Sequence, residues 1–200
     1  SRCHTHEEGD NGCAKAFKLI VLRSALRKYR RVLVLDDTVV VRRDAPDVFD
    51  LVPMVALGAT VEDPLVRKPE EAKQSLEISC LRYGIPCNTE EAWFNSGVLV
   101  ASWPQLGLVE TLPPWDSFER VLHWDQGYLN AMRLKYDVPL VDLGYAFNWV
   151  GSFHSTNSEN APFSAFDAFF VHGTTGLFLP HRERGEYLVN VSRAWDLVGL

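Results

Sequence analysis

The sequence predicts one α/β domain over its 200 residues, with a mixed, mostly parallel sheet flanked by helices. One observation is the apolar run Val32–Leu35, which is followed at once by Asp36 and Asp37. Aliphatic runs without polar alternation are typical of strands buried on both faces, as in parallel sheets. Another is an amphipathic pattern at residues 14–29, which predicts a helix directly before this strand. No linker is long enough to separate two domains, so we expect residues 1–200 to form a single one.

The first elements follow from local signals in chain order. The helix at residues 14–29 carries Arg27 and Lys28 near its C-terminus, where positive charge suits the helix dipole. A second apolar run, Val39–Val41, comes after the two acids. Pro46 then favours a short helical turn over residues 47–50, because proline suits the first position of a helix.

Further apolar runs and helix signals continue this pattern toward the C-terminus. Residues 62–92 are charged, and we interpret them as an excursion from the sheet with a helix from Pro69 to about Tyr83. We expect other helices over residues 116–122 and 123–132, and a terminal helix from about Glu183. Predicted strands cover residues 54–60, 93–101, 138–143, 145–150 and 166–171.

Composition excludes some classes of partner. The formal charge of −6 gives no general attraction to nucleic acid or to anionic membranes. No apolar run approaches the ~20 residues that would span a bilayer. The four cysteines permit three disulfide pairings or none and do not decide the compartment, for which the cytoplasm is slightly favoured over the secretory-pathway lumen.

The acids after the first strand need a counter-charge. Unpaired buried carboxylates are costly, and the carboxyl end of a strand is where open α/β sheets bind ligands. A cation is therefore the natural partner of Asp36 and Asp37. The alternative is that they cap a turn or pair with Arg42 or Arg43.

Polar residues also follow other predicted strands. Asn95 and Ser96 precede the run Val98–Ala101, and His172 ends the last strand. Such strand ends can converge on one cleft, where carboxylates and an imidazole suit Mn²⁺ or a similar cation that in turn binds a diphosphate. Asp125 and Gln126, at a helix start, could hold sugar hydroxyl groups by hydrogen bonding.

The order of these motifs resembles the retaining glycosyltransferases of family 8, the glycogenin and galacturonosyltransferase kind, which have the Rossmann-like GT-A fold. Residues Tyr29 to Asp50 match the family's Tyr-x-x-Val-Leu-x-Leu-Asp-x-Asp-x-x-Val segment and its Leu-Phe-Asp turn. The other matching segments are Phe94-Asn95-Ser96-Gly97-Val98, Trp124 to Asn130, Phe147-Asn148, and Phe170-Val171-His172 with Gly176 and Pro180 downstream. The resemblance covers roughly residues 15 to 182.

The resemblance implies roles for individual residues. Asp36 would be the first metal ligand and His172 the last, with Thr38 in place of the second carboxylate of Asp-x-Asp. The residues implied to bind the donor or its phosphates are Lys18, Asp37, Thr38 and Gly176. The residues implied to face the transferred sugar are Asn95, Asp125 and Gln126.

The implied activity is metal-dependent transfer of a sugar from a nucleoside diphosphate, most simply a UDP-sugar, to a glycan or protein acceptor with retention. Mn²⁺ or Mg²⁺ would be the cofactor, with no nucleic acid partner and no membrane segment. Leu179 replaces the lysine of the family's closing Lys-Pro, and the family's N-terminal nucleoside-binding strands are not found in these 200 residues. Together with Thr38, these departures favour the alternative of a non-catalytic relative that binds glycan or a protein partner.

Each implied residue also has a purely structural explanation. Asn95 could satisfy a turn, Asp125 could cap a helix, His172 could be a core histidine, and Lys18 could be a solvated helix lysine. Their shared order along the chain favours the functional interpretation of all of them together.

Overall fold

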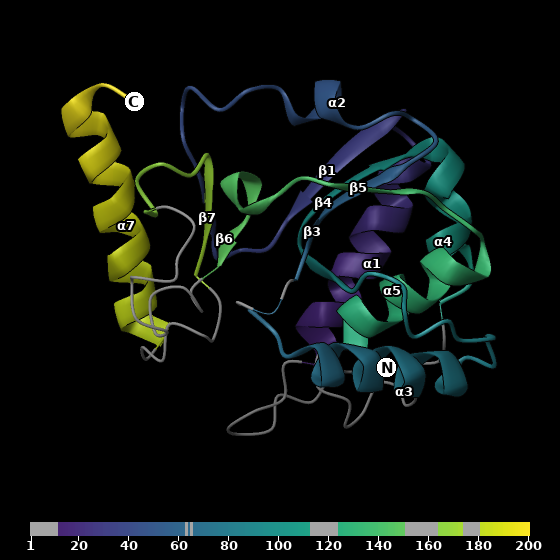
Figure 1. The fold of residues 1–200 in the computed structure, drawn as a ribbon. Coiled ribbons are helices and arrows are strands. Elements are labelled where there is room, and N and C mark those ends of the chain that lie inside the picture. The colour runs from purple at the N-terminus through teal and green to yellow at the C-terminus, as the bar shows by residue number, and fades with distance from the viewer. Residues whose placement is uncertain (1–11, 63, 65, 113–123, 151–163, 174–180) are drawn as a thin grey trace.

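A computed structural model describes residues 12–62, 64, 66–112, 124–150, 164–173 and 181–200. In these ranges the chain forms two sheets with helices packed against them (Figure 1). The first sheet has the order β1 (Arg31–Leu35), β4 (Phe94–Ser102), β3 (Leu57–Val61), β5 (Leu140–Asp142). The second has the order β2 (Val39–Val41), β7 (Phe170–His172), β6 (Trp149–Val150).

Strand pairing confirms a mixed α/β fold but corrects the expected direction of most strands. The pairs β1–β4, β3–β4 and β2–β7 are antiparallel, whereas β3–β5 and β6–β7 are parallel. The described pairings are therefore not mostly parallel. The apolar run of β1 has another cause: Val32 and Val34 pack into one core, while Leu33 and Leu35 pack into a second core on the opposite face. Both faces of β1 are apolar because both meet a core.

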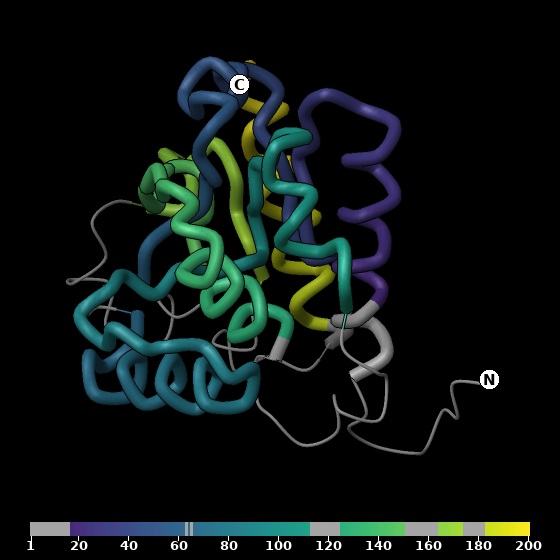
Figure 2. The backbone as a smooth tube through the Cα atoms, turned by 90° about the vertical axis from the view of Figure 1, so that its right-hand side faces the viewer, coloured from purple at the N-terminus to yellow at the C-terminus, as the bar shows by residue number. Residues whose placement is uncertain are grey.

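Three apolar clusters hold the layers together. The largest lies between the first sheet and the helices α1 (Gly12–Leu26), α3 (Pro69–Arg82), α4 (Gly107–Glu110) and α5 (Trp124–Lys135). A second packs α7 (His181–Val198) onto the second sheet. The third joins the opposite face of the first sheet to α2 (Val48–Leu51), the 3₁₀ turn η3 (Tyr145–Phe147) and β7. In Figure 2, α3 lies along the bottom of the molecule with α5 directly above it, and the two helices are in contact.

The expected helices at 14–29, 47–50 and 69–83, the helix opening near 123, and the terminal helix are confirmed with small shifts of their ends. The expected strand at 145–150 is wrong in its first half, because η3 occupies Tyr145–Phe147 and only Trp149–Val150 pair as a strand. The short elements η1 (Trp103–Leu106) and α4 were not predicted. The expected helix at 116–122 lies outside the described residues.

Two further observations concern the described residues. Among the cysteines whose side chains the structure describes, Cys80 is buried and Cys87 is exposed, and both are free thiols. None of the described helices is long and apolar enough to cross a membrane.

Candidate functional site

The chain crosses from the first sheet to the second immediately after β1, and this crossing places Asp36. The backbone N–H of Asp36 donates to the carbonyl of Gly97 at 2.8 Å, and the Asp36 carbonyl accepts from the N–H of Val39 at 3.1 Å. The Thr38 carbonyl in the same turn accepts from the N–H of Gly173 at 2.8 Å. The end of β1 is therefore held against the end of β7.

This arrangement brings together the two residues expected to bind a cation. His172, the last residue of β7, places Nε2 3.5 Å from Oδ2 of Asp36. They are separated by more than a hundred positions in the sequence and come from different sheets. The alternative pairing of Asp36 with an arginine is wrong, since Arg42 pairs with Asp44 at 2.6 Å and Arg43 with Asp196 at 3.4 Å.

Lys18 connects this pair to the start of α5. Its ammonium group lies 2.6 Å from Oδ1 of Asp36 and 2.7 Å from Oδ2 of Asp125, and it donates to the carbonyl and hydroxyl oxygens of Ser96. The Ser96 hydroxyl in turn donates to Asp125 at 3.0 Å. The alternative of a solvated lysine is thus wrong, because the Lys18 ammonium pairs with two carboxylates.

The titration behaviour of these groups follows from burial and charge. Burial by itself would lower the pKa of Lys18, but the carboxylates of Asp125 and Asp36 outweigh it and raise that pKa above 10.5. Burial would raise the pKa of Asp36, yet the neighbouring imidazole of His172 and the charge of Lys18 lower that pKa to about 2. The Lys18–Asp36 pair is therefore charged across the neutral range.

Asp125 and Gln126 are positioned by the close approach of α5 to α3. A Cβ atom on Gly127 would lie 2.5 Å from the hydroxyl oxygen of Ser79, so the absence of a side chain at position 127 lets the two helices touch. Asp125 and Gln126 occupy the first turn of α5 and are both buried. Asp125 does more than cap a helix, because it binds Lys18 and Ser96.

Glu62 belongs to this site and was missed by the sequence analysis. It directly follows β3, is buried, and accepts hydrogen bonds from Asn95 Nδ2 at 2.8 Å and from Gln126 Nε2 at 3.2 Å. Its other carboxylate oxygen pairs with Arg67. The available signal was its place directly after an apolar strand, the same place that Asp36 has after β1.

Asn95 lies at an irregularity of β4. Opposite β3 the register jumps, so that Ala59 pairs with Leu99 but Thr60 pairs with Asn95. The residues between Asn95 and Leu99 are displaced from the ladder with β3, and the Asn95 side chain accepts from the N–H of Gly97 at 2.8 Å and from Asn148 Nδ2 at 3.0 Å. Asn95 thus lies among the site residues, and its side-chain oxygen accepts one hydrogen bond from a backbone N–H and one from a side-chain amide.

Asn148 completes a chain of hydrogen bonds to the histidine. Its side chain is fully buried, and Oδ1 lies 3.0 Å from Nδ1 of His172. Gly97 leaves room for the ring, because a Cβ atom there would lie 2.0 Å from Cε1 of His172. Asn148 therefore contacts the His172 ring directly, and Gly97 leaves the space that the ring occupies.

The donor set suits a divalent cation in part. Two ligands at about 2.0–2.2 Å from one ion lie about 3–3.5 Å apart, which agrees with the 3.5 Å between Asp36 Oδ2 and His172 Nε2. A histidine ligand commonly donates its other ring N–H to an oxygen, which Asn148 provides here. Within the described ranges, however, no three His, Cys, Asp or Glu side chains gather as a metal-binding group. Asp36 and His172 are thus spaced as two ligands of one ion would be, and the described residues supply no third ligand of these types.

Three predicted residues lie at the edge of this arrangement or beyond it. Asp37 is exposed in the turn, and no described residue forms an ion pair with it. Thr38 contacts the end of β7 through its backbone carbonyl. Gly176 lies outside the described residues. The structure thus brings together Lys18, Asp36, Asn95, Asp125, Gln126 and His172.

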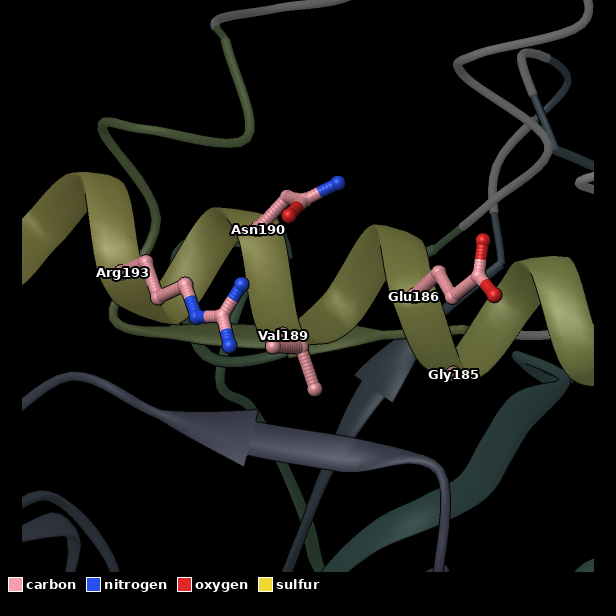
Figure 3. Close-up of a pocket in the computed structure, with 5 residues that line it drawn as sticks. All are labelled: Gly185, Glu186, Val189, Asn190 and Arg193. Carbon is pink, nitrogen blue, oxygen red and sulfur yellow. The ribbon is translucent and has the colours of Figure 1, made fainter.

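A separate hollow of about 520 Å³ lies on α7 (Figure 3). Its described lining comes from one helix: Gly185, Glu186, Val189, Asn190 and Arg193. None of the candidate site residues described above lines this hollow.

Comparison with known proteins places the fold. No family model matches the sequence, and no curated protein matches it. Among solved structures, the bifunctional glycosyltransferase WbbM, in its apo form, is similar at a TM-score of 0.52 and 16% identity, over 84% of this chain and 32% of that one. An active-site mutant of LgtC is similar at 0.52 and 18%, over 88% of this chain and 66% of that one. The galactosyltransferase LgtC in complex with donor and acceptor sugar analogues is similar at 0.51 and 18%, over 86% and 64%.

These similarities define the class of fold. The chain has the mixed α/β fold of GT-A glycosyltransferases. It spans about a third of the WbbM structure and under two thirds of the LgtC structures.

Proposed function

We propose that the protein is a glycosyltransferase of the family 8 kind, which transfers a hexose from a nucleoside-diphosphate sugar to a glycan or protein acceptor with retention. The observation that carries this proposal is the convergence of Asp36 and His172, from different sheets, with Lys18 and Asp125 beside them. The sugar analogues bound to LgtC, a protein of similar fold, support a sugar donor and acceptor here.

In this proposal Asp36 and His172 hold Mn²⁺ or Mg²⁺. A cation there would stabilise the negative charge that develops on the departing diphosphate. Lys18 holds the same carboxylate in place through its ion pair, next to the position that the donor phosphates would take. Asp125 and Gln126 lie at the start of α5 next to Lys18 and Glu62, where they can bind the sugar hydroxyl groups.

Thermal unfolding with Mn²⁺ and UDP tests the binding half of the proposal. Ligands that bind only the folded protein stabilise it, by about 2.7 kcal/mol at a hundred times the dissociation constant. We expect a clear rise in Tm with both ligands together, and its loss in Asp36→Asn. Asp196→Asn is the matched control, because its carboxylate is exposed and pairs on the surface with Arg43 rather than with a residue of this site. No rise at millimolar concentrations would overturn metal-dependent donor binding.

Transfer itself is tested by incubation with UDP-sugars and a glycan acceptor panel. A transferase should release UDP and lose that activity by orders of magnitude in Asp36→Asn. Two observations favour a second candidate, a non-catalytic glycosyltransferase-like protein that binds glycan or a protein partner. Lys18 already neutralises the carboxylate of Asp36, and Thr38 replaces an expected acid. Under this second candidate, Asp36→Asn would leave glycan or partner binding unchanged.

A further inference from the structure

A continuous set of hydrogen bonds runs from a buried carboxylate to the imidazole of His172. It starts at Oε1 of Glu62, passes through the side chains of Asn95 and Asn148, and ends at Nδ1 of His172. The four residues come from both sheets: Glu62 follows β3, Asn95 is in β4, Asn148 precedes β6, and His172 ends β7. We call this set the Glu62–His172 relay.

The direction of the relay is fixed at its first step. A carboxylate only accepts hydrogen bonds, so Asn95 must turn its NH₂ group toward Glu62. Its Oδ1 then faces the other way, where the N–H of Gly97 donates to it at 2.8 Å. A flipped Asn95 would place two acceptors together at Glu62 and two donors together at Gly97. Both neighbours thus select the same orientation.

This orientation is passed on to Asn148. Oδ1 of Asn95 is an acceptor, so the group of Asn148 that lies 3.0 Å away must be its NH₂. The remaining Oδ1 of Asn148 faces Nδ1 of His172 at 3.0 Å. Because an amide oxygen has no proton to give, Nδ1 must carry the proton in this contact. Asn148 has no exposed surface, so water does not offer it an alternative partner.

We infer that Glu62, through Asn95 and Asn148, holds the neutral His172 ring as its Nδ1–H tautomer, with the lone pair of Nε2 directed to the side of Asp36. Glu62, Asn95 and Asn148 are therefore positioning residues for His172. The Nε2 lone pair and Oδ2 of Asp36, 3.5 Å apart, would repel without a positive charge or proton between them. The Nε2 atom and the carboxylate oxygen can then both donate an electron pair to a single cation. The role in cation binding rests on the proposed function, whereas the tautomer does not.

Gly97 has a second part in this arrangement. Its N–H fixes Asn95, and the absence of a side chain leaves space for the ring, since a Cβ atom would lie 2.0 Å from Cε1 and 2.4 Å from Nδ1 of His172. Arg67 pairs with the second oxygen of Glu62 and so balances the buried charge from which the relay starts.

Nitrogen NMR of the wild-type protein tests the inference directly and without metal. The protein would be labelled with ¹⁵N-histidine, and long-range ¹H–¹⁵N correlations would be recorded at a pH where the ring is neutral. The His172 signals would be assigned by their loss in His172→Gln. We expect the proton of His172 on Nδ1. A proton on Nε2, or rapid exchange between both nitrogens, would overturn the inference.

Two leucine variants show whether the relay is the cause. Asn148→Leu removes the acceptor at Nδ1, and we expect the proton to move to Nε2, where Asp36 can accept it. Asn130→Leu is the matched control: Asn130 is equally buried, but its side chain bonds the backbone of Phe94 and Gln126 instead. The His172 tautomer should be unchanged there. An unchanged Nδ1–H tautomer in Asn148→Leu would contradict the role of the relay, and the wild-type spectrum decides the tautomer even where a variant does not fold.

Binding of Mn²⁺ alone separates this inference from the proposed function. Loss of a group that orients a metal-binding histidine weakens metal affinity by about 10- to 100-fold. We expect a loss of Mn²⁺ affinity of that size in Asn148→Leu and none in Asn130→Leu. The affinity would be measured from the electron paramagnetic resonance signal of free Mn²⁺. Should wild type show the Nδ1–H tautomer but no Mn²⁺ binding, the relay stands and the metal-dependent function falls. Equal Mn²⁺ affinity in wild type and Asn148→Leu would overturn the positioning role.

Discussion

Replacement of Lys18 by methionine tests whether buried ion pairs hold the candidate site together. The Lys18 ammonium lies 2.6 Å from Asp36 and 2.7 Å from Asp125, and the three side chains are 11%, 29% and 6% exposed. Methionine keeps much of the side-chain volume but leaves two neighbouring carboxylates without their counter-charge. Removal of one partner of a buried ion pair destabilises a protein by about 3–5 kcal/mol. Because Asp36 is partly hydrated, we expect the lower end, about 3 kcal/mol.

The assay is urea denaturation at neutral pH, with Lys73→Met as the matched control. Lys73 lies 2.6 Å from Glu90, the same distance as in the Lys18–Asp36 pair, but its side chain is 47% exposed and that of Glu90 is 76% exposed. An exposed pair contributes less than about 1 kcal/mol and is screened by salt. The two variants thus differ in burial at equal distance. The raised pKa of Lys18 means that its contribution is complete below 10.5 and is lost only as the pH rises above that value.

Two results would refute this reasoning. The first is an equal loss of stability in Lys18→Met and Lys73→Met, which would mean that burial does not strengthen the Lys18 pairs. The second concerns the double variant Lys18→Met with Asp125→Asn. Neutralising Asp125 removes one of the stranded charges, so the double variant should be more stable than Lys18→Met alone. A further loss of stability instead would show that the charges are not the cause.

The remaining predictions concern Gly97 and Asp36. In Gly97→Ala the new Cβ would overlap the imidazole of His172, so we expect a loss of about 1–3 kcal/mol in urea denaturation. Gly107→Ala, where no atom lies within 4 Å of the new Cβ, should change stability by less than about 1 kcal/mol, and a similar loss in both would contradict the steric argument. The pKa of Asp36 falls from 3.8 to about 2, worth about 2 kcal/mol that is present above pH 3.8 and lost as the pH falls toward 2. The stability difference between wild type and Asp36→Asn should therefore shrink over that interval, and a constant difference would contradict it.

The elements that the sequence predicted well are those whose local signals agree with their packing. The helix at 69–83 begins at a proline and is confirmed almost to the residue as α3. The strand around Phe94 to Ala101 is long, apolar and central, and β4 is buried along nearly its whole length. The polar residues at strand ends, Asp36 and His172, were expected to meet, and their side chains lie 3.5 Å apart.

Strand direction could not be read from the same patterns. An apolar run indicates that both faces are covered, but it does not say whether the neighbouring strand runs parallel or antiparallel. In β1, Val34 packs into one core and Leu33 into another on the opposite face, so both faces are apolar. The strand nevertheless pairs antiparallel to β4. Burial was thus inferred correctly and sheet direction was not.

Glu62 and the role of Asn148 were missed for another reason. Glu62 stands at the start of a charged stretch, where a glutamate is ordinarily a solvated residue. The register jump in β4, which brings Asn95 opposite Thr60, places the Asn95 amide within reach of Glu62. Asn148 follows a 3₁₀ turn in a segment that was expected to be a strand. Both depend on contacts between segments far apart in the sequence.

The candidate site is a property of the junction between the two sheets rather than of a single motif. Asp36 ends a strand of the first sheet, and His172 ends a strand of the second. The Glu62–His172 relay crosses that junction between Asn95 and Asn148. The apolar cluster that contains Val98, Val100 and Phe170 also joins the two sheets. The same packing that buries these apolar side chains thus sets the distance between the two candidate ligands. A motif such as Asp-Asp-Thr after β1 gains its chemical meaning only when the second sheet brings the imidazole to it.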